Sequence, residues 1–368
     1  MSKLVLDSLE IKNFRAFKHL RIENLGRVNL IVGKNNVGKS SLLEALRVHA
    51  LRGEPFTISM ILGERDEIAL EETEARLSGV NAHDFALAIN NLFYERRDTR
   101  KPHDAIVVGS AHDIENTVLL DVVWPVLRVN SDNGVDNSIH NLSQTPELSG
   151  TFGTRAPFSF PLDRYYQWGS FAETVETLSR FNLFYIGTAG LRPAISALLW
   201  DGIALSDLEQ DVLAALRIIA PQVDAVSLIR NSGASGVRIP IVRLVGTSQR
   251  IPLRSMGEGM NRMFGIALAL VNAKDGMLLI DEVDTGLHYS VLPDLWRLIF
   301  EVAHRLNVQV FATTHSKDCL DAFQYAADEN TEEEGVLIRL ENRKAGVGAV
   351  TFDEEELAIV TRERIEVR

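Results

Sequence analysis

Residues 28–40 read VNLIVGKNNVGKS, an apolar run that passes directly into a glycine-rich loop. Val28 to Val32 has the length and apolar character of a short buried strand. The next eight residues, Gly33 to Ser40, match the pattern G-x-x-x-x-G-K-[ST], and Ser41 to Leu51 has apolar residues at helical spacing. A strand, a glycine loop and a helix in this order predict a phosphate-binding loop in an α/β fold.

Each residue type in this loop has a physical role. Gly33 and Gly38 allow the backbone to turn its N–H groups inward, and the helix that follows adds its positive N-terminal end. We expect Lys39 to reach the β and γ phosphates of a nucleotide and the Ser40 hydroxyl to bind Mg²⁺. Three further residues are expected to bind the nucleotide at the same loop: Asn35, Asn36 and Ser41.

A second apolar run, Met277 to Ile280, ends in the acids Asp281 and Glu282. A buried parallel strand delivers such side chains to the sheet edge where a phosphate loop also ends. The pattern predicts that Asp281 holds Mg²⁺ and that Glu282 orients and deprotonates the attacking water.

Three further segments flank this strand. Ser255-Met256-Gly257-Glu258-Gly259 opens a helical run and predicts a second anion site, which would serve a nucleotide held by another copy; the alternative is an ordinary capped helix. The strand Val308 to Ala312 runs into His315, either a contact for the γ phosphate or a plain surface histidine. Asp284 lies in a turn suited to contact across a two-fold axis.

The remaining elements follow from apolar periodicity. Strands are expected at Leu4 to Leu6, Leu20 to Ile22, Ala105 to Val108, Thr117 to Val129, Leu183 to Ile186 and Val237 to Val245. Helices are expected at Ala82 to Glu95, Ala194 to Leu199, Leu208 to Ile219, Gly257 to Val271 and Val291 to Leu306, and a polar stretch at Ser131 to Gly153.

The alternation of strands and helices in the last third favours a mostly parallel central sheet. We therefore divide the chain into residues 1–51, with the phosphate loop, residues 52–182, an insertion with a β-subdomain and a helical region, and residues 183–368, with the other motifs. After His315 we expect one helix, two strands and a short acidic helix ending at Arg368.

Composition limits the cellular context. The 368 residues include one cysteine, Cys319, and carry a formal charge of −12. A lone cysteine excludes an internal disulfide framework and fits a reducing compartment, and no apolar run is long enough to span a bilayer. We expect a cytoplasmic protein with no membrane partner. Its negative charge argues against a globally basic nucleic-acid binder, although a local basic face can coexist with it.

The order GKNNVGKSS, SMGEG, LLIDEVDTGLH and TTHS, together with the opening IKNFRAF at residues 11–17, resembles the ABC-type ATPase heads of the RecF and overcoming-lysogenization-defect (OLD) families. The resemblance implies an Mg²⁺-dependent ATP hydrolase whose two sites form when two copies meet head-to-tail. It also implies that Ser255 and Gly257 form the signature, Asp284 the D-loop and His315 the switch histidine, and that Arg15 lies near the nucleotide.

The sequence departs from those families at three points. The signature lacks the longer serine-rich form of transporters, and Gly187 to Gly190 follow the strand at 183–186 where a Q-loop glutamine is expected. Only about fifty residues follow His315, fewer than a Toprim nuclease domain needs. Stand-alone ATPases of this kind resemble components of bacterial anti-phage systems, so we expect a homodimer or higher oligomer that regulates a separately encoded effector, such as a Toprim-type nuclease.

Two other functions are considered. One is a RecF-like repair ATPase that clamps DNA, for which Arg96, Arg97, Arg100 and Lys101, beside Phe93 and Tyr94, would contact phosphates; the alternative is a solvated charged turn. The other is a transporter ATPase subunit, which the IKNFRAF segment and the family resemblance disfavour.

Overall fold

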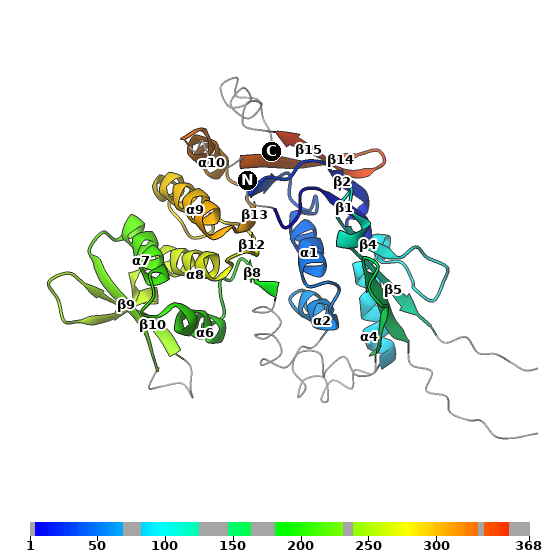
Figure 1. The fold of residues 1–368 in the computed structure, drawn as a ribbon, viewed down its shortest axis with the longest axis horizontal. Coiled ribbons are helices and arrows are strands. Elements are labelled where there is room, and N and C mark those ends of the chain that lie inside the picture. Colours follow the sequence, from blue (N-terminus) through cyan, green and yellow to red (C-terminus); the bar gives the residue numbers. More distant parts are fainter. Residues whose placement is uncertain are drawn as a thin grey trace, which may run out of the picture. The chain divides into compact units, whose positions relative to one another are not determined.

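The computed structural model describes residues 4–68, 82–124, 146–162, 181–230, 238–329 and 335–352. Its contacts divide the chain into two compact units (Figure 1). The first unit comprises Met1–Leu9, Ile22–Leu43 and Leu178–Arg368, and the second comprises Glu10–Arg21 and Glu44–Thr177. The second unit thus includes residues 10–21 and 44–51 in addition to most of the 52–182 segment.

A six-stranded sheet forms the centre of the first unit, in the order β15-β14-β3-β13-β12-β8. Its strands are β3 (Val28–Val32), β8 (Leu183–Ile186), β12 (Met277–Ile280), β13 (Gln309–Thr313), β14 (Gly335–Arg343) and β15 (Gly346–Phe352). Every pairing in it is parallel except that of β14 with β15, which is antiparallel. The sheet is therefore mostly parallel, as the sequence predicts.

The register of this sheet brings the motifs to one edge. Ile31 of β3 pairs with Thr313 of β13, and Ile280 of β12 pairs with Ala312. Because these strands are parallel, the phosphate loop after β3, Asp281 after β12 and His315 after β13 all leave the same edge.

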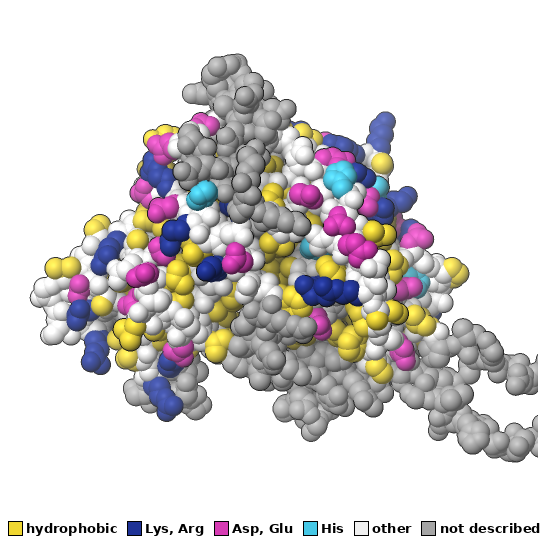
Figure 2. Space-filling view, in the orientation of Figure 1, with side chains coloured by type: hydrophobic (Ala, Val, Ile, Leu, Met, Phe, Trp, Pro, Cys, Tyr) yellow, Lys and Arg dark blue, Asp and Glu magenta, His cyan; other side chains and the backbone are white. Residues whose placement is uncertain are grey.

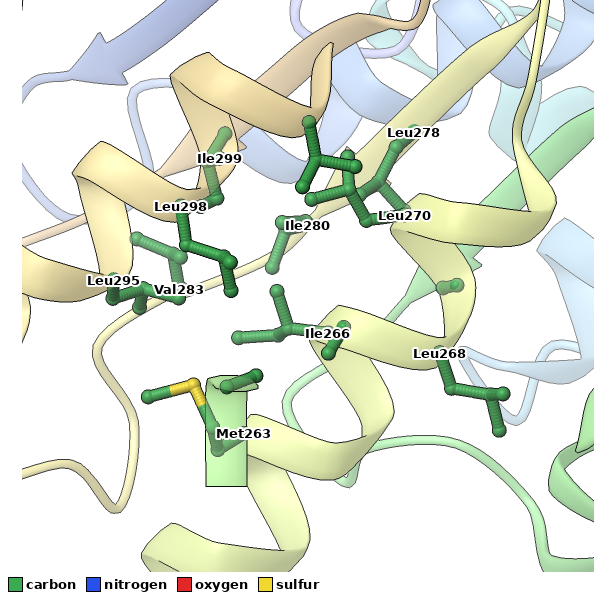
Figure 3. Close-up of a cluster of buried hydrophobic side chains, with 14 of the residues drawn as sticks. Met263, Ile266, Leu268, Leu270, Leu278, Ile280, Val283, Leu295, Leu298 and Ile299 are labelled. Carbon is green, nitrogen blue, oxygen red and sulfur yellow. The ribbon is translucent and has the colours of Figure 1, made fainter. Parts of the chain in front are cut away.

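Helices pack around the sheet and complete the core of the first unit. They are α1 (Lys39–Ala50), which continues into the second unit, α6 (Pro193–Ile203), α7 (Leu208–Ile219), α8 (Glu258–Asn272), α9 (Leu292–Leu306) and α10 (Lys317–Glu329). Figure 3 shows Met263 and Ile266 of α8 converging with Ile280 of β12 and Leu298 of α9. Full burial of side chains this size contributes about 1.5–3 kcal/mol each, so α8 and β12 are held together firmly.

A small antiparallel sheet, β11-β10-β9, completes the first unit. Its strands are β9 (Val223–Arg230), β10 (Arg238–Leu244) and β11 (Arg250–Pro252). The sheet packs on α6 and α7, and a short 3₁₀ turn, Leu253–Met256, leads from it into α8. Ser255 of the predicted signature therefore lies between this sheet and α8.

The second unit is built on a six-stranded sheet in the order β2-β1-β4-β5-β6-β7. Its strands are β1 (Leu9–Phe14), β2 (Phe17–Ile22), β4 (Ile106–Gly109), β5 (Thr117–Val123), β6 (Glu147–Phe152) and β7 (Phe158–Pro161). The pairings from β1 through β7 are antiparallel. Two helices, α2 (Pro55–Gly63) and α4 (Ala82–Ile89), belong to the same unit, which matches the predicted antiparallel β-subdomain and helical region.

The predicted strand at Leu4 to Leu6 is wrong, because the first strand starts at Leu9. Leu6 instead bonds to the side chain of Gln309: its N–H donates to Oε1 at 2.9 Å, and its carbonyl accepts from Nε2 at 2.7 Å. Gln309 is fully buried, so this side chain satisfies backbone groups that a strand partner would otherwise satisfy.

Two other expectations need correction, and one strand was not expected. The polar stretch Ser131 to Gly153 contains β6, since pairing with β5 and β7 overrides its weak intrinsic preference. The helix expected to reach Glu95 ends at Ile89 and gives way to short 3₁₀ turns, in which Glu95 has a φ of 59°. The sequence analysis also missed β9 in the first unit. The predicted acidic helix ending at Arg368 and most of the 131–153 stretch lie outside the described residues.

Candidate nucleotide site

The phosphate loop adopts a conformation that its glycines permit. Gly33 has a φ of 145° and Gly38 a φ of 110°, which disfavour any other residue. A Cβ on Gly33 would lie 2.6 Å from the carbonyl oxygen of Leu340. The loop therefore packs so tightly against the end of β14 that a side chain at position 33 does not fit.

Lys39 lies in this loop with its amine held by backbone oxygens. Nζ donates to the carbonyls of Gly33 at 2.8 Å and Lys34 at 3.1 Å. Burial lowers the pKa of this amine, and the nearby carboxylates of Asp281 and Glu282 partly oppose that shift. A buried cation at the start of a helix is positioned to bind phosphate oxygens.

Ser40 and Asp281 meet directly. The Ser40 hydroxyl donates to Oδ2 of Asp281 at 2.9 Å, and Thr313 donates to the other carboxylate oxygen at 2.6 Å. A hydroxyl and a carboxylate in contact are the hard oxygen ligands that Mg²⁺ prefers, and they lie beside the phosphate loop. The residues thus fit the predicted metal, which Ser40 and Asp281 would hold.

Glu282 has an unusual backbone conformation for a non-glycine residue, with a φ of 50°. Its N–H donates to Thr313 Oγ1 at 2.8 Å, and its carboxylate accepts from Thr285 at 3.1 Å. Left-handed conformations of this kind cost about 1–3 kcal/mol and persist where surrounding contacts fix them. Glu282 is therefore a partly exposed carboxylate on a constrained backbone.

His315 joins Lys39 to Glu282. Its Nδ1 lies 3.2 Å from Lys39 Nζ, and its Nε2 lies 3.7 Å from Glu282 Oε1. The His315 and Glu282 side chains are each 40% exposed, so both face solvent at the sheet edge. The structure thus gathers Lys39, Ser40, Asp281, Glu282 and His315 into one constellation.

The predicted signature lies at the start of α8. Ser255 and Gly257 are exposed, and α8 begins at Glu258 with no side-chain cap. The first N–H groups of an uncapped helix are open to an external anion. Among the hydrogen bonds of the described residues, none joins Ser255 or Gly257 to the constellation around His315.

The remaining predicted residues differ in exposure and in hydrogen-bond partners. Asn35 and Asn36 are exposed in the loop, Ser41 is buried, and Asp284 accepts a 2.6 Å hydrogen bond from Thr314. Arg15, in the second unit, is buried and pairs with Glu44 at 3.0 Å and with Glu67 at 2.8 Å. Its guanidinium is thus bound to carboxylates, and its contact with a nucleotide stays a prediction.

Sequence reasoning missed two residues. Thr313 bonds both Asp281 and Glu282, although the sequence analysis assigned a role only to His315 in the segment TTHS. Arg262 lies in α8, where it is 3% exposed and donates to backbone carbonyls near the acids. A lone arginine among the apolar residues of the helical run was the available signal.

Comparison with known families agrees with this geometry. Residues 5–110 match the family described as "AAA ATPase domain", and residues 242–321 match "AAA domain, putative AbiEii toxin, Type IV TA system". The first match includes the phosphate loop, and the second includes Ser255, the acids and His315. The chain is a P-loop ATPase.

Two similar proteins match different shares of this ATPase. An "ATP/GTP phosphatase" of Helicobacter pylori is 23% identical over 340 residues, covering 86% of this chain and 87% of that protein. A "DNA replication and repair protein RecF" of Listeria welshimeri is 35% identical over 74 residues, covering 20% of this chain and 19% of RecF.

Among solved structures, an SMC head bound to the C-winged helix domain of ScpA has a TM-score of 0.52 at 13% identity, covering 96% of this ATPase and 99% of that chain. At this identity the likeness shows the fold alone. The ATPase therefore has the fold of an SMC head, with the mostly parallel sheet of ABC-type heads.

Proposed function

We propose that two copies of this ATPase close head-to-tail around ATP and that the closed dimer regulates a separately encoded effector in bacterial anti-phage defence. The observation that carries the dimer is the open surface at the signature. The constellation around His315 is internally bonded, whereas Ser255 and Gly257 are exposed beside an uncapped helix. A second phosphate cradle of this kind fits the nucleotide of a second copy.

The residues at the first site have distinct roles in this proposal. Lys39 binds the β and γ phosphates, and Ser40 and Asp281 hold the Mg²⁺ that screens phosphate charge. Glu282 orients the attacking water and accepts its proton, a role open to a carboxylate that faces solvent. His315 hydrogen-bonds to the γ phosphate or to that water. Ser255 and Gly257 of the other copy complete the cradle.

Two of the similarities support the proposal of a separate effector. An SMC head of the same fold is described with the C-winged helix domain of ScpA bound to it, and the matched family description names a toxin of a type IV system. Both descriptions are compatible with an ATPase that works with another protein, and a Toprim-type nuclease is one candidate. A closed dimer regulates such a partner only if the partner binds one nucleotide state better.

The cellular location in this proposal is the cytoplasm. No helix among the described residues is long and apolar enough to cross a membrane. The single cysteine, Cys319, is buried, and burial raises the pKa of its thiol to about 12, so it stays an unreactive thiol.

Locking the closed state tests both parts of the proposal. With ATP and Mg²⁺, Glu282→Gln should form a dimer in sedimentation experiments, whereas Lys39→Ala should stay monomeric at the same concentration. Affinity purification from the native host should recover one specific protein with the first variant and not with the second. A Glu282→Gln chain that stays monomeric with saturating ATP would contradict the dimer.

A hollow in the second unit favours DNA contact as the second candidate function. It measures about 430 Å³ and is lined by Lys12, Lys18, His19 and Arg97, with Tyr94 beside them. Part of this charge is already neutralised, since Lys12 and His19 both pair with Glu10. On the face that Figure 2 shows, basic and acidic side chains are interspersed and form no single basic patch.

The arginine cluster expected to contact DNA is also partly engaged. Arg100 forms two 2.8 Å hydrogen bonds to Asp98, and Phe93 is 1% exposed and so cannot stack on a base. Duplex binding with ATP, measured over a range of salt concentrations, separates the two functions. Lys18→Glu should abolish tight, salt-dependent binding if DNA occupies the hollow, and should change nothing if it does not.

A further inference from the structure

Arg262 is a buried cation at the start of the apolar part of α8. It is 3% exposed, and its neighbours in α8, Met260, Met263 and Phe264, all belong to the hydrophobic core. Burial lowers the pKa of its guanidinium, and the nearby Asp281, Asp284 and Glu282 act in the opposite direction. Placing a charge here is costly unless it is paired or hydrogen-bonded.

The hydrogen bonds of Arg262 go to backbone carbonyls at three points around the hydrolysis centre. Nη2 donates to the carbonyl of Asp281 at 2.7 Å and to that of Glu282 at 2.9 Å. Nη1 donates to Gly187 at 2.6 Å, in the loop after β8. The planar guanidinium has donors in a fixed fork, so one side chain ties three backbone positions together.

Two of these bonds constrain the backbone at Glu282. Glu282 has a φ of 50°, a conformation that its own side chain does not favour. Thr313 accepts a hydrogen bond from its N–H, and Arg262 donates to its carbonyl. The peptide groups on both sides of Glu282 are therefore anchored, and the direction of its carboxylate depends on these anchors.

The same helix carries the signature. α8 starts at Glu258, directly after Gly257, and a Cβ on Gly259 would lie 2.8 Å from the carbonyl oxygen of Gly286 in the turn after Glu282. The start of α8 thus packs closely on this turn, while Arg262, one turn later, holds the acids. Figure 3 shows that Met263, next to Arg262, packs with Ile280 at the end of β12.

We propose that Arg262 is a positioning residue that holds the Glu282 carboxylate in its hydrolytic orientation and links that orientation to the signature helix. It touches neither nucleotide nor water and acts through the backbone of Asp281 and Glu282. The inference rests on the proposed role of Glu282 as the base. A nucleotide bound at Ser255 and Gly257 by the start of α8 is thereby connected to Glu282 of the same chain.

Replacing the guanidinium of Arg262 with the single amine of a lysine tests its positioning role. Arg262→Lys keeps the charge but cannot reach three carbonyls at once, so the Glu282 carboxylate should shift. A shift of about 1 Å at a reacting group costs roughly 100-fold in rate, and we expect kcat to fall on that order while the Kd for ATP stays within a few-fold. Arg262→Gln should behave in the same direction.

Arg27→Lys is the matched control. Arg27 is also 3% exposed in the first unit, but it precedes β3, at the end of the sheet away from the phosphate loop, and donates to Asn307. We expect this variant to keep kcat. Unfolding of both Arg262 variants while Arg27→Lys stays folded would overturn the proposal, because Arg262 would then be needed for stability.

Combining variants separates the positioning role of Arg262 from the role of Glu282 as the base. If Arg262 acts through Glu282, adding Arg262→Lys to Glu282→Gln should cause no further loss of turnover. Low turnover in Glu282→Gln with normal turnover in Arg262→Lys would overturn the positioning role alone. Normal turnover in Glu282→Gln would overturn the base itself, whatever Arg262 does.

Discussion

The constellation around His315 and the signature at Ser255 are both proposed phosphate sites, yet they differ in how many internal hydrogen bonds they have. In the first, Lys39, Ser40, Asp281 and Glu282 are hydrogen-bonded to one another or to neighbouring residues such as Gly33 and Thr313. In the second, an exposed serine and glycine precede a helix with no side-chain cap. In the proposed dimer, each chain would supply a preformed hydrolysis site and an open binding surface for the nucleotide of the other.

The largest expected effect is on turnover. Glu282→Gln keeps the size of the side chain but cannot accept a proton, and general-base catalysis contributes about 100- to 10,000-fold. Steady-state hydrolysis should fall within that range while ATP binding, measured by equilibrium titration, is retained. Hydrolysis close to the wild-type rate would show that Glu282 is not the general base.

The next effect is on binding. Lys39→Ala removes a charged donor, and hydrogen bonds to charged groups contribute about 1.5–3 kcal/mol, so ATP affinity should fall roughly 10- to 100-fold. Lys34→Ala is the matched control, since Lys34 lies in the same loop with an exposed side chain. Equal losses in the two variants would show that the loop's charge, and not the position of Lys39, determines binding.

Mixing two variants tests whether the signature of one copy completes the nucleotide site of the other. Ser255→Glu should repel the partner's nucleotide and, like Lys39→Ala, should be inactive alone. Each mixed dimer has one intact site, so partial turnover should return, to at most about a quarter of the wild-type rate if the two chains pair at random. No recovery, with subunit exchange demonstrated by labelled chains, would show that the sites do not form in trans.

The smallest effect is on stability and compares two glycines of positive φ. An alanine at position 33 would meet the Leu340 carbonyl, whereas nothing lies within 4 Å of a Cβ at position 257. Gly257→Ala should therefore cost only the backbone strain, about 1–3 kcal/mol, and Gly33→Ala should cost more. Thermal unfolding of both variants measures the difference, and equal shifts would contradict the tight packing of the phosphate loop.

The sequence predicted the parts of the fold that short-range pattern determines. β3, β8, β12 and α7 have the bounds expected from apolar periodicity. The candidate site followed from the same elements, because parallel strands bring their carboxyl ends to one edge. Neither result required knowledge of which strands are neighbours.

What the sequence could not predict depends on long-range contacts. Arg262 was not identified because its guanidinium donates to backbone carbonyls about 20 and 75 positions away in the chain. Every residue has such a carbonyl, so the sequence does not show which ones an arginine reaches. Leu6 was misassigned because its partner is a side chain, Gln309. The strand β6 looks polar because its stability comes from the strands on either side.

The position of β3 between β13 and β14 also has a consequence for synthesis of the chain. Val28 pairs with Val310 on one side and with Gly335 on the other, so the strand that carries the phosphate loop cannot pair with either neighbour until the chain has been extended by about 280 and 310 residues, respectively. Contacts of such sequence separation form slowly. A nascent chain on the ribosome therefore contains every residue of the phosphate loop long before it can hold a nucleotide.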